Sequence, residues 1–384
     1  MNINIKYPDR LRKVQCLMKQ QGLKAYVGMR FSTLSYLTGV FIPWRCAVVM
    51  PDEGPLIGIW FERDADRIIH ESWISDHRIW GSTEDLLPAV ARTLTELGLA
   101  ESRIGVEFRG EGGRGALGVL CAFEYEELKN RLPHAHFEEG RAVLDEAMVI
   151  KEKEEIALLR QAAAIADAGL LAVRDFIRPG LTENQVAGEA ERAMRDLGNE
   201  WNWSLSGGTE VGSGPRSAFA GGFTQPATGK VIQQGENIIL DLHPMYRLYM
   251  ADACFNLVVG KPSEKQLRLA EVWEKTAKVL LENIHDGVRI ADAARAANSV
   301  LQESEFAPYS LLGYFGHGLG VDTRVPPTIN LKNESTFREN MTIAAGVHIY
   351  VPGLGGMRME LPALVGKTGA EPLCKLGMKL HVTA

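Results

Sequence analysis

Two aspartates inside otherwise apolar, strand-like segments are the feature that most constrains the fold of this chain. Residues 239–255 read ILDLHPMYRLYMADACF, so Asp241 and Asp252 lie eleven positions apart, each within an apolar run. Burying a carboxylate without a partner is strongly unfavourable. The fold must therefore bring both acids to water, to cations of the chain, or to a bound metal ion.

Length and composition define the setting. A chain of 384 residues predicts two domains. Hydrophobic residues at 46%, charged residues at 23% and a net charge of -6 are typical of a globular protein that binds neither nucleic acid nor an anionic membrane. The first fifteen residues lack an apolar signal core, and we find no uncharged run long enough to span a bilayer, so we expect a cytoplasmic location. The five scattered cysteines indicate neither a disulfide framework nor a cysteine zinc site.

The first part of the chain alternates helix-like and strand-like patterns. Helices are expected within 8–23, 83–99 and 117–132, and strands at 25–29, 46–50, 55–60 and 103–107. This order predicts an α/β domain. Residues 110–115, GEGGRG, match the dinucleotide motif G-x-G-x-x-G, but they do not lie in the opening βαβ unit, and Glu126 and Glu127 fall in the following helix instead of ending the next strand, so a surface turn is the favoured interpretation.

A second pattern begins near Asp145 with a long amphipathic helix that stops before Pro179-Gly180. We therefore expect an N-terminal domain over 1–147 and a second domain over 148–384. Capping boxes at Thr182 and Ser263 predict the starts of two further helices. Residues 177–194 resemble residues 284–301, which indicates either an internal duplication or shared helix-turn chemistry.

Four side chains of the second domain form a candidate metal site. Asp241 and Asp252 reach one face if the segment between them folds into an antiparallel pair; His317 lies in the glycine-rich YFGHGLGVD, and Glu360 in an apolar strand. Each has an ordinary alternative, such as a packed histidine or a Glu360 ion pair with Arg358. Together, two Asp, one His and one Glu suit Mn, Fe, Co or Zn.

These motifs resemble a known family. The order of two aspartates, then GHGLG, then GGMRME, is similar to aminopeptidase P, prolidase, methionine aminopeptidase and creatinase, and the resemblance extends from about residue 148 to the end. It implies a pita-bread fold after a creatinase-type α/β N-terminal domain. It also implies one or two divalent ions at the four residues above, and a homodimer in which an early loop with Trp44 and Arg45 covers the partner's pocket.

The chain departs from the family pattern at three places. Where shorter-looped members resemble TIEPGIYIP, this chain reads AAGVHIYVP, so Gly346 replaces a metal-binding glutamate. Gly221 replaces a substrate-binding histidine, and Arg324-Val325 replaces a His-Glu pair. All three changes concern peptide-bond chemistry.

The resemblance also predicts how the ligands divide. One ion keeps its full set of Asp241, Asp252 and Glu360, whereas a second keeps only Asp252, His317 and Glu360, so a single ion, or a tight one with a loose one, is expected. Two histidines are candidates for compensation. His348 follows Gly346 by two residues and His243 follows Asp241 by two, which places each pair on one strand face. Alternatively, His348 is an ordinary strand histidine and His243 contacts a ligand or the substrate.

The sequence therefore favours a metal-dependent hydrolase that acts on a small amide or peptide-like molecule and is not an efficient general Xaa-Pro peptidase. Glu360, His243 or His348 would transfer protons. Arg324 indicates an anionic group on the substrate, or else a surface salt bridge. Two alternatives stay open: a lyase of the dimethylsulfoniopropionate-lyase kind, and a non-catalytic binding protein.

Overall fold

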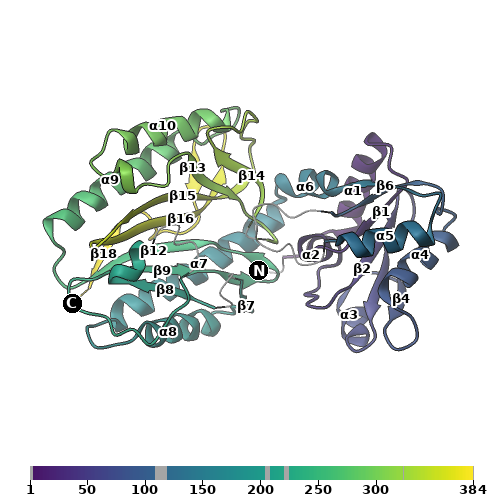
Figure 1. Cartoon of the computed structure of the whole chain (residues 1–384), viewed down its shortest axis with the longest axis horizontal. Coiled ribbons are helices and arrows are strands. Elements are labelled where there is room, and N and C mark those ends of the chain that lie inside the picture. Colours follow the sequence, from purple (N-terminus) through teal and green to yellow (C-terminus); the bar gives the residue numbers. More distant parts are fainter. Residues whose placement is uncertain (1–2, 109–118, 204–207, 220–224, 323, 384) are drawn as a thin grey trace. The chain divides into compact units, whose positions relative to one another are not determined.

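The structure, a computed structural model, describes residues 3–108, 119–203, 208–219, 225–322 and 324–383 (Figure 1). The chain divides into two compact units, Asn4–Met148 and Val149–Ala384, the latter with the first three residues. The GEGGRG segment lies outside the described residues.

The smaller unit is an α/β layer domain. Its elements are α1 (Tyr7–Gln20), β1 (Ala25–Gly28), α2 (Phe31–Thr38), β2 (Ala47–Pro51), β3 (Ile57–Phe61), α3 (Ala65–Glu71), β4 (Asp76–Trp80), α4 (Leu86–Glu96), β5 (Arg103–Val106), α5 (Ala122–Arg131), β6 (His136–Glu139) and α6 (Arg141–Val149). Its described strands form one mixed sheet in the order β4-β3-β2-β1-β5-β6. The expected strands and helices are confirmed.

Helix α2 was not expected from the sequence. All eight of its residues, FSTLSYLT, are buried although four are Ser or Thr, so the segment lacks the exposed polar face that marks a surface helix. It begins directly after Arg30, whose guanidinium lies beside the buried Glu107. Because the helix is buried on every side, the spacing of apolar and polar residues in the sequence does not reveal it.

The larger unit is an α+β domain built on a curved sheet. Its elements are α7 (Lys153–Phe176), α8 (Glu183–Asp196), β7 (Trp201–Asn202), β8 (Glu210–Ser213), β9 (Asn237–Leu242), β10 (Pro244–Tyr246), β11 (Tyr249–Met250), β12 (Ala253–Val259), α9 (Glu264–Glu282), α10 (Ile290–Gln302), β13 (Tyr314–Gly318), β14 (Val325–Asn330), β15 (Thr342–Val351), β16 (Gly355–Val365), β17 (Ala370–Pro372) and β18 (Leu380–Thr383). The described strands of the main sheet run β14-β13-β15-β16-β12-β9-β8, with β17 on β16 and β18 on β12.

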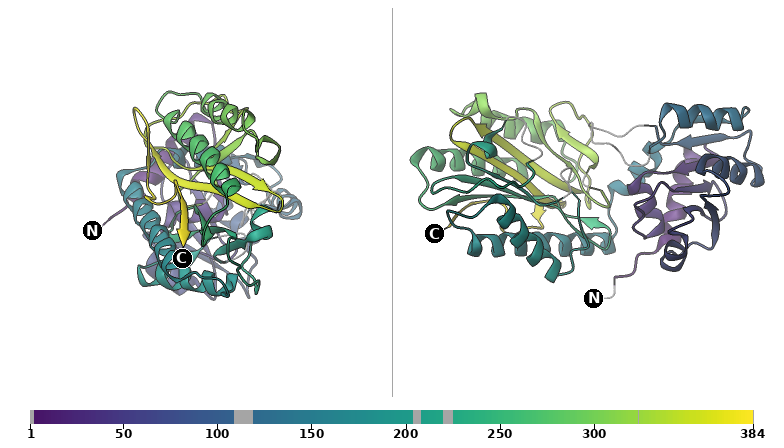
Figure 2. Two further views of the ribbon diagram at one scale, coloured as in Figure 1. Left: turned by 90° about the vertical axis from the view of Figure 1, so that its left-hand side faces the viewer. Right: turned by 60° about the horizontal axis from the view of Figure 1, so that its bottom comes forward.

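Two helix pairs cover different parts of this sheet (Figure 2). Helices α7 and α8 pack against each other and on β8 to β12, whereas α9 and α10 pack on β14 to β16. The predicted capping boxes at Thr182 and Ser263 begin α8 and α9. Both halves of the unit thus consist of a helix pair followed by strands.

Helix α7 is long and apolar enough to cross a membrane, with a mean hydropathy of 1.6 over an 18-residue window. Such a helix was not expected from the sequence, because the segment contains charged residues. Leu158, Leu159, Ala162 and Ala166 are fully buried or nearly so, and the helix packs on α8 and β10. Its apolar face therefore belongs to the core of the larger unit.

Candidate metal centre

Strands β9 and β12 bring the two aspartates together. The strands are antiparallel, with Cys254 opposite Asp241 and Ala253 opposite Leu242, and Asp252 immediately precedes β12. The β10 and β11 strands form the connecting hairpin. The antiparallel pairing predicted for residues 239–255 is therefore confirmed.

Strand β16 adds the third carboxylate. Glu360 lies opposite Cys254 of β12 on one side and opposite Gly346 of β15 on the other. The side chains of Asp241, Asp252 and Glu360 are exposed by 3% or less. Three carboxylates from three segments thus meet in the interior of the larger unit.

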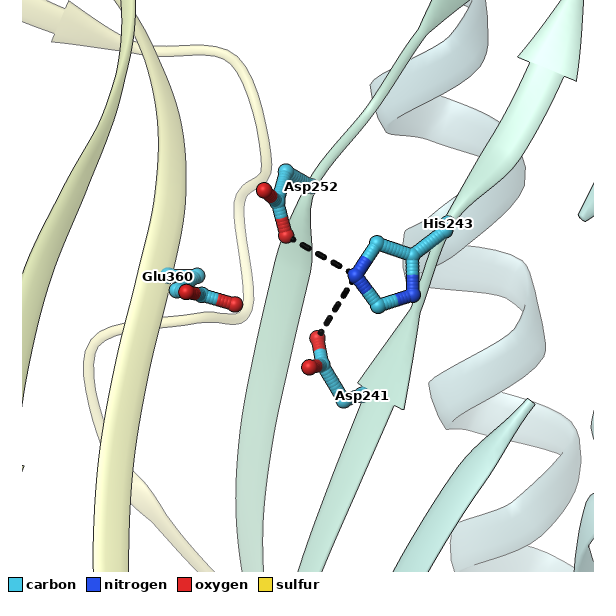
Figure 3. A group of neighbouring side chains, drawn as sticks. All are labelled: Asp241, His243, Asp252 and Glu360. Carbon is cyan, nitrogen blue, oxygen red and sulfur yellow. Dashed lines mark ion pairs between the residues drawn. The ribbon is translucent and has the colours of Figure 1, made fainter. Parts of the chain in front are cut away.

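His243 completes the cluster shown in Figure 3. One ligand atom from each of Asp241, His243, Asp252 and Glu360 lies within 4.8 Å of the other three. His243 Nε2 is 3.1 Å from Asp252 Oδ1 and 3.7 Å from Asp241 Oδ1. The imidazole follows Asp241 by two residues, so both side chains point to the same side of the chain, as the sequence predicted.

Arg358 lies against the same carboxylates. Its Nη1 is 3.0 Å from Asp241 Oδ2 and its Nη2 donates to Glu360 Oε2 at 2.7 Å. The Arg358 side chain is buried, and it shares a strand face with Glu360. The ordinary alternative of an Arg358–Glu360 ion pair is thus present, but the guanidinium is shared between Glu360 and Asp241.

The structure places two further candidate histidines at the edge of the cluster. His317 Nε2 is 3.3 Å from Asp252 Oδ2, and His348 Nε2 is 3.9 Å from Glu360 Oε1. His317 belongs to β13 and His348 to β15. Neither joins the group of four, so among the described residues the histidine within that group is His243 and not His317.

The pKa values reflect an excess of buried negative charge. Burial raises the pKa of Asp241 well above its ordinary value, against the opposing charge of Arg358. Burial also disfavours ionisation of Asp252, but the nearby His243 outweighs burial and holds the pKa of Asp252 well below its ordinary range. Burial disfavours the charged form of His243, yet Asp241 and Asp252 raise its pKa to about 10. For Glu360, Arg358 overcomes burial and lowers the pKa to about 2.

The hydrogen bonding of the Asp241 oxygens shows whether these residues suit a metal ion. Both of its oxygens, and Asp252 Oδ1, are buried and accept no hydrogen bond of good geometry from the described residues. Buried polar atoms almost always find a donor, so such atoms call for a ligand. Carboxylate oxygens with imidazole nitrogen are the donors that Mn, Fe, Co and Zn bind. The residues present therefore fit a divalent cation.

Two residues near the cluster were not anticipated from the sequence. Glu210 of β8 pairs with Asp241 in the sheet register and is 2% exposed. Tyr350 follows His348 by two residues, and its buried hydroxyl has no hydrogen-bond partner among the described residues. Tyr350 also lines a pocket of about 570 Å³ with Pro215, Phe219, Pro308 and Tyr309. The period of two along 346, 348 and 350 is the signal that could have identified Tyr350.

Arg324 lies beside the cluster through Tyr314. Its Nη1 donates to the Tyr314 hydroxyl at 3.0 Å, and the Tyr314 ring centroid is 6.2 Å from that of His348. The second departure noted in the sequence, Gly221, lies outside the described residues.

An α/β domain followed by a curved-sheet domain with a buried Asp, His and Glu cluster defines the class of creatinase-like, pita-bread proteins. Residues 10–148 match the creatinase/prolidase N-terminal domain, and residues 157–367 match metallopeptidase family M24. The second match covers more than half of the chain, which belongs to metallopeptidase family M24.

Relatives and solved structures agree with this assignment. The chain is 29% identical over 296 residues to an Xaa-Pro dipeptidase of Pyrococcus horikoshii, covering 74% of this chain and 82% of the relative. It is 30% identical over 266 residues to an Xaa-Pro dipeptidase of Pyrococcus furiosus, covering 69% and 74%. In fold it is similar to an Xaa-Pro dipeptidase from Bacillus anthracis, with a TM-score of 0.84, 23% identity, and 98% and 100% of the two chains covered.

Proposed function

We propose that this chain is a metal-dependent hydrolase that cleaves a small amide or peptide-like substrate. The observation that carries the proposal is the buried Asp241, whose two oxygens accept no hydrogen bond of good geometry from the described residues while Asp252, His243 and Glu360 converge on them. Relatives named as Xaa-Pro dipeptidases support a hydrolase of the peptidase type.

Asp241, Asp252 and Glu360 would hold the ion, with His243 as a nitrogen ligand and His317 beside Asp252. When bound, such an ion lowers the pKa of water and polarises the scissile carbonyl. Arg358 fixes the orientation of Asp241 and Glu360 through its two terminal nitrogens. His348 Nε2 lies 3.9 Å from Glu360 Oε1 and would exchange a proton with that carboxylate once the two groups approach to hydrogen-bond distance.

Charge favours a single ion. Three carboxylates and the Arg358 guanidinium leave two negative charges when His243 is neutral, and one divalent ion cancels them. Gly346 adds no carboxylate for a second ion. Because uncompensated charge is costly in a buried site, the set present fits one tightly held ion better than two.

The surroundings fit a small substrate. The pocket of about 570 Å³ beside Tyr350 is lined mainly by proline and aromatic side chains, which suits an apolar group attached to the cleaved amide. We also propose a cytoplasmic homodimer. Trp44, 50% exposed and in contact with the Phe61 ring, is a candidate for the subunit interface, and light scattering that shows a monomer would contradict this.

Metal analysis tests the proposal first. After reconstitution with Mn, Fe, Co or Zn, the protein should contain about one ion per chain, and Asp252→Asn should lose it. Asp292→Asn is the control, since Asp292 is an exposed carboxylate in surface ion pairs. No ion in the unmodified protein would refute the proposal in favour of a non-catalytic binding protein.

Product analysis then separates the reaction classes. The loaded protein should release an amine from small N-acyl amides. Elimination from sulfonium or betaine acids, with no amide cleavage, would instead show a lyase.

A further inference from the structure

Glu210 is a buried carboxylate on the face of the sheet that carries the candidate metal centre. It lies directly opposite Asp241 in the pairing of β8 with β9, and directly opposite residues point to the same side of a sheet. Asp241 belongs to the group of four ligand residues, whereas Glu210, which is 2% exposed, lies outside that group. Glu210 therefore borders the centre on the side of β8.

Glu210 has few partners for a buried charge. Its Oε2 accepts one hydrogen bond, from the backbone N–H of Gln225 at 3.1 Å, and it forms no ion pair with any residue that the structure describes. By contrast, the buried Glu183 of the same unit accepts hydrogen bonds from Ser213 and pairs with Arg216. A buried carboxylate with one donor and no cation calls for a further donor.

The imidazole of His243 offers that donor. Its Nε2 faces the two aspartates, whereas Nδ1 lies on the other side of the ring, turned away from Asp252 and Glu360 (Figure 3). Nδ1 is buried and has no hydrogen-bond partner within the described part of the chain. Because the strands follow one another as β16-β12-β9-β8, Glu210 also lies on the side of β9 that is away from Glu360.

The sheet register places the two groups within reach of each other. His243 follows Asp241 by two residues, so Glu210 and His243 are diagonal neighbours on one face, a spacing that long side chains span. The charges agree with this placement. Burial lowers the pKa of His243, but the two aspartates and Glu210 raise it by more.

Metal binding by His243 creates the need for an acceptor. An imidazole that binds an ion through Nε2 is neutral and carries its proton on Nδ1. That N–H usually donates to a carboxylate or a carbonyl, which fixes the tautomer and the ring orientation and makes the ligand more basic. With no acceptor the buried N–H would be unsatisfied, and the alternative tautomer has its proton on the nitrogen that should bind the ion.

We infer that Glu210 is a positioning residue of the metal centre, which accepts a hydrogen bond from Nδ1–H of His243 and so holds Nε2 ready to bind the ion. The hydrogen bond forms when the Glu210 carboxylate turns toward the imidazole. This inference rests on the proposed metal-dependent hydrolase and adds to it a residue that acts through His243 and does not touch the ion.

The test is a double-mutant cycle on metal affinity, measured by calorimetry with Zn²⁺. Glu210→Leu, which keeps a similar side-chain size, should weaken binding about 10- to 100-fold, the usual effect of losing the partner of a metal-binding histidine. Glu210→Gln should weaken it less, because the amide oxygen still accepts a hydrogen bond. In the His243→Ala background, Glu210→Leu should have no further effect.

Proton NMR of the zinc-loaded protein with ¹⁵N-labelled histidine provides a second readout, which a merely structural role would not change. The Nδ1–H resonance of His243 should lie far downfield in the unmodified protein and move upfield in Glu210→Leu. Glu305→Gln, at an exposed glutamate paired with Arg268, is the control and should change neither the affinity nor the resonance.

Unchanged zinc affinity in Glu210→Leu would overturn the inference. An equal loss with and without His243 would overturn it too, because Glu210 would then act on the ion or on another ligand. Both results leave the hydrolase proposal standing, since the unmodified protein would still bind its ion. Absence of any ion in the unmodified protein would refute both.

Discussion

The His348 imidazole occupies the space that a side chain at Gly346 would need. A Cβ placed on Gly346 would lie 2.7 Å from His348 Cε1, closer than side chains approach each other. Both residues face the same side of β15, and Gly346 pairs with Glu360 in the sheet. The glutamate expected at 346 and a histidine at 348 therefore exclude each other unless one moves.

This relationship predicts the outcome of restoring the glutamate. Gly346→Glu alone should bind no second ion, and it should destabilise the protein by about 1 to 3 kcal/mol through overpacking. Gly346→Glu with His348→Gly should recover both stability and a second ion. Metal stoichiometry and urea denaturation of the single and double variants measure this. A second ion in the single variant would show that His348 moves away easily.

His243 provides the next prediction. Because its Nε2 lies between Asp241 and Asp252, His243→Ala should weaken binding of the first ion at least about 10- to 100-fold, the loss typical when even a residue that only contacts a metal ligand is removed. Calorimetry with Zn²⁺ or Co²⁺ measures the change. His285→Ala, at an exposed histidine, is the control. Unchanged affinity in His243→Ala would remove this residue from the ligand set.

Glu107 is predicted to stabilise the smaller unit. Its buried carboxylate accepts hydrogen bonds from Tyr26, from the Thr33 hydroxyl, and from the backbone and Nε of Arg30. Glu107→Gln leaves the buried Arg30 guanidinium with Asp145 as its remaining carboxylate partner, so the loss of charged hydrogen bonds should destabilise this unit by about 1.5 to 3 kcal/mol. Hydrogen exchange of the β1 and β5 amides in urea measures this change in the free energy of unfolding. Glu138→Gln, in an exposed pair with Arg103, should change little.

The Glu107 carboxylate should also make the stability of the smaller unit depend on pH. Burial opposes ionisation of Glu107, but Arg30 and the hydrogen bonds outweigh it and lower the pKa. A group whose pKa is lower in the folded state stabilises the protein above its unfolded pKa and loses that contribution as the pH falls through the folded value. The stability difference between the unmodified protein and Glu107→Gln should therefore be constant near neutrality and shrink below about pH 4.5. A difference that grows on acidification would refute this assignment.

Much of the fold was predictable because its signals are local. Capping boxes mark α8 and α9, and the two apolar runs around Asp241 and Asp252, with a short segment between them, indicated their antiparallel pairing. Helix α2 was not predictable, since it is buried on all sides, including its Ser and Thr residues, and has no exposed face.

The site was less predictable because it depends on contacts between distant segments. That Arg358 would face Asp241 as well as Glu360 follows from the neighbouring positions of β9, β12 and β16, which no spacing reveals. The same holds for Glu210, which reaches Asp241 only through the pairing of β8 with β9.

The last prediction concerns cleavage of Xaa-Pro dipeptides, the activity for which the relatives are named. Gly346 offers no carboxylate to bind a second ion or to take a proton, and the space is filled by His348. Arg324 and Val325 stand where a His-Glu pair is expected, so neither imidazole nor carboxylate is available there for proton transfer. Losing one such group typically lowers the rate by about 100- to 10,000-fold, and the losses are not additive. Turnover of Xaa-Pro dipeptides by the metal-loaded protein should therefore be weak or undetectable.

A coupled assay for released proline measures this turnover, with the Gly346→Glu/His348→Gly variant compared with the unmodified protein. The double variant should be the faster of the two. Efficient release by the unmodified protein would show that His243, His348 or a bound water performs the proton transfer assigned to the missing glutamate.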